Sequence, residues 1–197
     1  MPVQDGVGLT AERERRPGRA QAPAAPVAGG GTLAVVATRN DVEGLTVRLF
    51  EGAADAAAFR ALNEEWISRQ FSLDERDRRQ LGDPVAAYID RGGAILIAEL
   101  DGRPVGCVAL VPDGAGACEL SKMAVASELR GRGVGRGLLA AAIDHARGLG
   151  ARSISLGSSR KLTSAVRLYE AFGFTHVPRE TLHLTSTRID VFMELAL

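Results

Sequence analysis

Ordered patterns of apolar and polar residues begin near residue 44. Residues 45–50 alternate like a half-buried strand. Residues 55–71 place Phe59, Leu62 and Trp66 at helical spacing, which predicts an amphipathic helix. Residues 72–84 are polar, and we interpret the charge alternation at 74–79 as a solvated face or a mobile loop. A short helix is expected near Val85–Ile89, with glycines ending it.

Strand patterns dominate the middle of the chain and alternate with helices afterwards. Two apolar runs, 94–100 and 105–111, flank an Asp-Gly turn dipeptide, which predicts a hairpin. A third strand is expected over 118–125. The later elements are a helix from the glycine-rich segment through about Arg147, a strand at 153–156, a helix at 163–172 and strands at 174–177 and 191–195. This order predicts an α/β domain built on a mixed sheet.

The first 31 residues have a different composition. They are mostly Gly, Ala, Pro and Arg, with few large apolar side chains, so they cannot bury enough surface to offset the entropy cost of ordering. We therefore expect a disordered tail over 1–31 and a folded domain over 32–197. Residues 33–37 could be a first short strand or part of the tail.

Charge and cysteine content narrow the function classes. Acidic and basic residues balance at 24 each, which gives no electrostatic reason to expect nucleic acid or an anionic membrane as a partner. The N-terminus lacks the apolar segment of a secretory signal, and the cytoplasm is the expected location. Cys107 and Cys118 form no ligand cluster, so we expect two buried thiols and no metal site.

The most informative segment is ELRGRGVGRGLLAAAI, residues 128–143. Glycines and arginines alternate directly ahead of an apolar helical run. The first N–H groups of a helix have no intrahelical partner, and the helix dipole makes that end positive. Glycines let those groups approach a ligand closely, and arginines add charge-assisted hydrogen bonds. The segment therefore predicts an anion site, most naturally for phosphate.

Two common phosphate loops fit this segment poorly. A Walker A loop needs a lysine that is missing here, and the glycine spacing is GxGxGxG where a dinucleotide fingerprint needs GxGxxG. A nucleotide-binding protein is therefore disfavoured. The other alternative is an ordinary helix start whose glycines reflect a biased composition.

The segment resembles the R/Q-x-x-G-x-G/A signature of the GNAT superfamily of N-acetyltransferases, with Arg130, Gly133 and Gly135 on the signature positions. Residues 165–174, AVRLYEAFGF, resemble a second segment of that family, and ELSKMAV at 119–125 resembles its fourth strand. The resemblance covers roughly residues 44 to 197. It implies a mostly antiparallel central sheet of six to seven strands flanked by about four helices.

The resemblance also implies acetyl-CoA as co-substrate, without a metal. The loop would bind its pyrophosphate, and the backbone of Met123 and Val125 would pair with the pantetheine arm and polarise the thioester. Ser159 stands where many members carry an asparagine, and it remains a weak candidate contact. The candidate cofactor-binding residues are Met123, Ala124, Val125, Arg130, Gly131, Arg132, Gly133, Val134, Gly135, Arg136 and Ser159.

Two residues match catalytic positions of the family. Glu119 matches a general base, and strand alternation predicts that it shares a face with Ser121, Met123 and Val125. The alternative is a solvated glutamate at a strand end. Tyr169 matches the tyrosine that protonates the leaving thiolate, and the alternative is a tyrosine that only packs in the core.

The acceptor site is less defined. In the family it is built largely from the first helices and their connection, here Asn63–Trp66 through Asp77. These residues are acidic and include the single tryptophan, which suits a cationic amine, although Trp66 also fits a core position. We expect a primary amine of a small molecule or peptide as acceptor. A homodimer and a non-catalytic acyl-CoA-binding module remain open.

Overall fold

The computed structural model describes residues 42–181 and 188–197. The expected tail over 1–31 and the uncertain strand at 33–37 lie outside these residues. Among the described residues, no helix has the length and apolar character needed to cross a bilayer.

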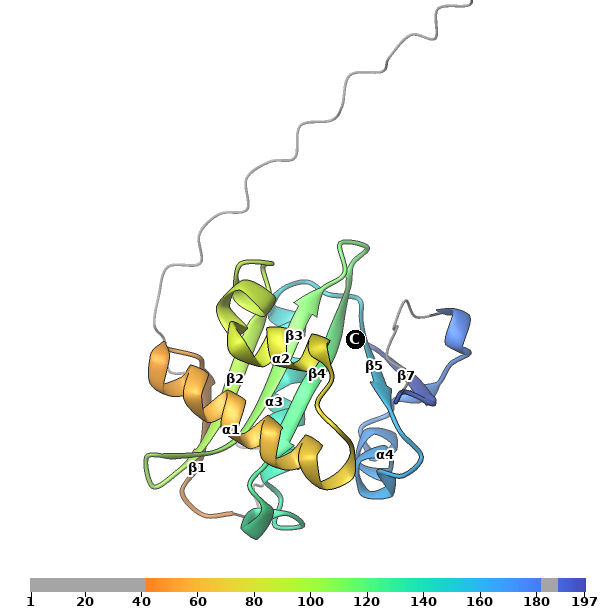
Figure 1. Ribbon diagram of the computed structural model, residues 1–197. Coiled ribbons are helices and arrows are strands. Elements are labelled where there is room, and N and C mark those ends of the chain that lie inside the picture. The colour runs from red at the N-terminus through yellow and green to blue at the C-terminus, as the bar shows by residue number, and fades with distance from the viewer. Residues whose placement is uncertain (1–41, 182–187) are drawn as a thin grey trace, which may run out of the picture.

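Seven strands of the described chain form one sheet in the order β1-β2-β3-β4-β5-β7-β6 (Figure 1). The strands are β1 Leu45–Leu49, β2 Ala94–Leu100, β3 Arg103–Pro112, β4 Ala117–Val125, β5 Ser153–Ser158, β6 Thr175–His176 and β7 Val191–Ala196. The β4–β5 pair is parallel, and the other neighbouring pairs are antiparallel. The predicted hairpin is β2–β3, with Asp101 and Gly102 in left-handed conformations at its turn.

Helices cover both faces of the sheet. The four α-helices are α1 Ala53–Gln70, α2 Glu75–Gly82, α3 Val134–Gly148 and α4 Thr163–Ala171. Helices α1 and α2 lie in front of the sheet and α3 behind it in Figure 1. The predicted fold class is confirmed in strand number, helix number and strand orientation.

Two apolar cores result from this layering. The core under α3 contains Leu138, Leu139 and Tyr169, whereas the core under α1 and α2 contains Phe59 and Tyr88. Cys107 and Cys118 are free and buried, as expected.

Of the two interpretations of residues 74–79, the mobile loop is wrong, whereas a solvated face holds for Asp74, Glu75, Arg78 and Arg79, which are exposed, but not for Asp77. Residues 74–79 form the start of α2, capped by Asp74, whose side chain accepts a hydrogen bond from the Asp77 N–H at 2.7 Å. The Asp77 side chain returns to the Asp74 N–H at 3.2 Å, which completes a capping box. Asp77 is only 1% exposed. This short helix is therefore held by its cap and by polar contacts rather than by an apolar stripe.

The start of α1 is tied to β1 by a mostly buried ion pair. Arg48 on β1 donates to Asp55 Oδ1 at 2.8 Å and to Glu99 Oε1 on β2 at 2.7 Å. The hydrogen bond from Arg48 holds the pKa of Asp55 below its ordinary value, although burial opposes this. This contact fixes where α1 begins relative to the sheet.

Candidate active site

The sheet opens between its two central parallel strands. Pairing of β4 with β5 ends at Leu120 and Leu156, although β4 continues to Val125. Beyond that point the strands diverge (Figure 1), and a cavity of about 540 Å³ is lined by residues from both sides of the opening. Strands β4 and β5, the glycine-rich loop, α4 and the α1–α2 connection all contribute to this one cavity.

A bulge in β4 changes the expected alternation of its side chains. Ala109 pairs with Ser121 but Cys107 pairs with Ala124, so one β3 residue lies opposite two β4 residues. Lys122, in the bulge, has a φ of 52°, which side-chain-bearing residues rarely adopt.

The bulge means that Glu119, Ser121, Met123 and Val125 do not share one face. Glu119 and Ser121 face α1 and α2, because they pair with Val111 and Ala109 of that core. Met123 and Val125 instead pack against the core under α3. The prediction from simple alternation is wrong, yet Glu119, Ser121, Met123 and Val125 all line the cavity, because it passes through the opening between the strands.

The glycine-rich loop leads into α3 as predicted. Gly131 and Gly133 have φ of 75° and 94°, so both need the freedom of glycine. Gly133 is the N-cap and supplies no side-chain hydrogen bond, which leaves the first N–H groups of α3 for another acceptor. A Cβ at Gly135 would lie 3.3 Å from Met123 Cε, so α3 approaches β4 closely here. Open N–H groups, glycines and nearby arginines fit an anionic group such as the pyrophosphate of CoA.

The arginines of this loop differ in their surroundings. Arg130 Nε donates to the Val125 carbonyl at 3.0 Å, and Nη2 lies 3.3 Å from Glu65 on α1, so this side chain ties the loop to β4 and α1. The Arg136 guanidinium lies 5.2 Å from the centroid of the Phe172 ring.

Most of the candidate residues come together in the cavity. Its lining includes Glu119, Met123, Val125, Arg130, Gly131, Gly133, Gly135, Arg136, Ser159 and Tyr169. Ala124, Arg132 and Val134 are not part of the lining. Ala124 faces the core under α1 and α2, Val134 is buried under α3, and Arg132 is exposed. The side chains of Ala124 and Val134 point into apolar cores, so only their backbone groups are left for the predicted role.

Tyr169 projects from α4 toward β4. Its hydroxyl lies 3.9 Å from Met123 Sδ, and its ring packs against Phe174 with centroids 5.7 Å apart. Burial raises the pKa of Tyr169 to about 12. The phenol is therefore protonated at neutral pH and can donate a proton into the cavity.

Glu119 lies across the opening from Tyr169, on the face of β4 that α2 covers. It is half-buried and lines the cavity. Burial raises the pKa of Tyr88, and the charge of Glu119 raises it further to a smaller extent. A carboxylate reached from the cavity can accept a proton from an amine, directly or through water.

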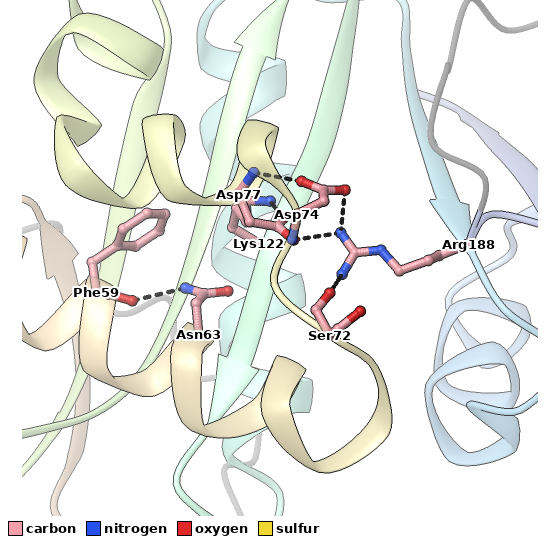
Figure 2. Close-up of polar contacts among 7 residues, drawn as sticks. All are labelled: Phe59, Asn63, Ser72, Asp74, Asp77, Lys122 and Arg188. Atoms are coloured by element: carbon pink, nitrogen blue, oxygen red, sulfur yellow. Dashed lines mark hydrogen bonds and ion pairs between the residues drawn. The ribbon is translucent and has the colours of Figure 1, made fainter.

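Most residues that were expected to bind the acceptor amine are buried or already paired with other side chains. Asn63 is 1% exposed and donates to the Phe59 carbonyl at 2.9 Å (Figure 2), whereas Trp66 is half-buried, contacts Phe71 and lines the cavity. The acidic residues in this region are paired with cations: Glu64 with Arg60, Glu65 with Arg69 and Arg130, Asp74 with Arg188, and Asp77 with Lys122 and Arg188. Attraction of a cationic amine by unpaired carboxylates in this stretch is therefore not supported.

Sequence reasoning missed the cluster of Asp77, Lys122 and Arg188 at this end of the cavity. The spacing of Asp74 and Asp77 before a run of charged residues is a capping-box pattern and could have indicated α2. Nothing local could have paired Asp77 with Arg188, because 111 residues separate them.

Residues 56–174 match the sequence profile of the acetyltransferase (GNAT) family. The chain belongs to the GNAT acetyltransferase family. The predicted superfamily is confirmed.

Two acetyltransferases of similar sequence support this assignment. The chain is 34% identical over 125 residues to an uncharacterized N-acetyltransferase of Schizosaccharomyces pombe, covering 61% of this chain and 76% of the relative. It is 35% identical over 151 residues to a mycothiol acetyltransferase of Thermobispora bispora, covering 68% of this chain but 47% of the relative. The chain thus spans about half the length of that enzyme.

The solved structure of an acetyltransferase is also similar. It is a Salmonella typhimurium protein solved with its cofactor acetyl-CoA, with a TM-score of 0.62 and 26% identity, over 77% of this chain and 93% of that one.

Proposed function

We propose that the protein is an acetyl-CoA-dependent N-acetyltransferase that moves an acetyl group directly to a primary amine of a small molecule or peptide. The observation that carries the proposal is the cavity in the opening of the sheet. It brings a glycine-rich helix start, a protonated tyrosine and a carboxylate into one space. A non-catalytic acyl-CoA-binding module would need the glycine-rich helix start but neither the tyrosine nor the carboxylate.

The donor would lie along the opening. The glycine-rich loop and the first turn of α3 would hold the CoA pyrophosphate, and the unpaired edge of β4 at Met123 and Val125 would hold the pantetheine arm. Acetyl-CoA supplies an acetyl group activated as a thioester. The similar Salmonella protein with acetyl-CoA supports this choice of donor.

Glu119 and Tyr169 would divide the proton transfers. Glu119 would take the proton that the attacking amine must lose, because an ammonium group has no lone pair. Tyr169 would donate a proton to the leaving sulfur, for which the raised pKa of its phenol keeps the proton in place at neutral pH. The two groups lie on opposite faces of the sheet, so the reacting carbonyl between them would be reached from both sides.

The acceptor class is open to a direct test. The relatives named mycothiol acetyltransferases favour a small molecule over a protein as acceptor. Purified protein would be incubated with acetyl-CoA and panels of amines, and both CoA release and acetylated product would be measured. The proposal predicts stoichiometric CoA and amide product for at least one amine. CoA release without any acetylated amine would contradict it.

A further inference from the structure

One buried carboxylate connects the two walls of the opening in the sheet. Asp77, on α2, accepts from Lys122 Nζ at 2.7 Å on one oxygen and from Arg188 Nη2 at 2.6 Å on the other. Figure 2 shows the two cations converging on it, with Asp74 beside them. Burial works to raise the pKa of Asp77, but the hydrogen bond and charge of Lys122, with help from Arg188, hold it below its ordinary value. Asp77 is thus a stable anion at neutral pH.

The two cations belong to opposite sides of the opening. Lys122 is on β4, whereas Arg188 lies three residues before the start of β7, which pairs with the far edge of β5. Arg188 also donates to the Ser72 carbonyl at 3.1 Å and to Asp74 Oδ2 at 3.2 Å. Backbone pairing between β4 and β5 has ended at this level, so Asp77 joins the walls where hydrogen bonds of the sheet do not.

Lys122 is also the residue that forms the bulge. Its positive φ is costly for a residue with a side chain, so other contacts must maintain it. The Lys122 ammonium group is largely buried against Asp77. This ion pair anchors the Lys122 side chain to α2. The neighbouring Met123 packs beside Tyr169 on the opposite face. Because of the bulge, Glu119 and Met123 face different sides of the opening.

We propose that Asp77 is a positioning residue for acetyl transfer: it holds the β4 bulge through Lys122 and the opposite wall through Arg188. In this way it sets Glu119 and the backbone of β4 relative to Tyr169 on α4. The proposal rests on the proposed function for its meaning in catalysis, but its structural part can be tested without an acceptor.

The first test is amide hydrogen exchange of the full chain. Asp77→Asn keeps the shape of the side chain and removes its charge. We expect amides of residues 121–124 to exchange at least about 10-fold faster, while those in the β2–β3 hairpin stay unchanged. Glu75→Gln makes the same chemical change on the same helix at an exposed ion pair, and it should leave both sets unchanged. Unchanged exchange at 121–124, or equal acceleration throughout the sheet, would overturn the proposal.

The second test separates turnover from binding. With an amine that the wild type acetylates, Asp77→Asn should lower kcat about 10-fold or more and leave the Kd for CoA within about 2-fold, because a small misplacement of reacting groups is expensive. An unchanged kcat, or a Kd that weakens as much as kcat falls, would overturn it. A wild type without turnover would instead refute the proposed function, while the exchange experiment would still report on the bulge.

A pair of Lys122 variants tests the bulge itself. Glycine adopts a positive φ without a steric penalty, whereas alanine does not. Lys122→Gly should therefore keep kcat within about 3-fold of the wild type, and Lys122→Ala should lose about 10-fold. Equal losses in the two variants would show that the lysine charge, not the backbone it holds, is what matters, and would contradict the proposal.

Discussion

At the scale of single residues, the account depends on two side chains that approach one cavity from different elements. Glu119 comes from β4 and Tyr169 from α4, and both line the opening in the sheet. Their surroundings differ in a way that suits opposite roles. Tyr169 is buried against Phe174 and Met123 and stays protonated, whereas Glu119 is half-buried on the side where the acceptor would enter.

Glu119→Gln tests the base. The amide keeps the size of the side chain but cannot take a proton, so turnover should fall at least about 30-fold. Affinity for acetyl-CoA, measured by calorimetry, should not change. Glu128→Gln, at an exposed position in the turn after β4, is the matched control and should keep full activity. A wild-type rate for Glu119→Gln would remove Glu119 from the mechanism.

Tyr169→Phe tests the acid. Loss of the hydroxyl should reduce kcat about 100-fold, a typical effect of removing a proton donor, with the melting temperature nearly unchanged. Tyr88→Phe is a useful comparison, since Tyr88 is also buried and its hydroxyl has no hydrogen bond of good geometry among the described residues. If Tyr169→Phe works at the wild-type rate, as Tyr88→Phe does, Tyr169 serves only in packing.

At the scale of elements, the proposed cofactor site depends most on the start of α3. Gly133 ends the loop as an N-cap in a left-handed conformation, and Gly135 lets the first turn approach β4 and α4. The side chains of Met123, Val125 and Leu168 around Gly135 leave little room for a larger residue at this position. The helix thus presents its N–H groups at the mouth of the opening.

Gly135→Glu should therefore abolish CoA binding. The Glu carboxylate would occupy the proposed phosphate position, and its negative charge would repel the CoA phosphates. Binding would be measured by calorimetry with CoA. The control is Gly148→Glu at the other end of the same helix, where an added side chain meets open space. Retained affinity in Gly135→Glu would mean that the loop does not bind the cofactor.

The link between β1 and α1 gives a prediction on acid stability. The folded-state pKa of Asp55 lies below its ordinary value, so the ion pair with Arg48 stabilises fully above about pH 4 and is lost as pH falls through the folded-state pKa. Asp55→Asn should cost about 2 kcal/mol near pH 7. Its melting temperature should also fall less steeply than that of the wild type between pH 4 and 2. Equal acid slopes would contradict this assignment.

These elements also show what could be predicted from the sequence. Strands β1 to β5, α1, α3 and α4 follow patterns of apolar spacing, and the glycine-rich loop was recognisable because its chemistry is local. Helix α2 was missed because it has few apolar residues and depends on a capping box and on Lys122 and Arg188. The β4 bulge was missed because alternation assumes one partner per residue, and only the register with β3 reveals the extra one.

At the scale of the whole molecule, the sheet is divided by its one departure from antiparallel pairing. The antiparallel strands β1 to β4 form one half, and β5, β7 and β6 form the other. The parallel pair that joins them is paired at one end and open at the other, so the same feature that links the halves makes the cavity. Strand β4 and helices α3 and α4 then bring Glu119, the glycine-rich turn and Tyr169 to this opening.

The central claim is that this opening binds acetyl-CoA, and thermal unfolding with acetyl-CoA, CoA and ATP tests it most directly. A ligand at about 100 times its Kd adds about 2.7 kcal/mol of stability. At about 2–4 °C per kcal/mol for a domain of this size, that is roughly 5–10 °C. The account predicts this shift with acetyl-CoA and CoA and none with ATP. A folded protein that shows no shift with acetyl-CoA, or the same shift with ATP, would contradict it.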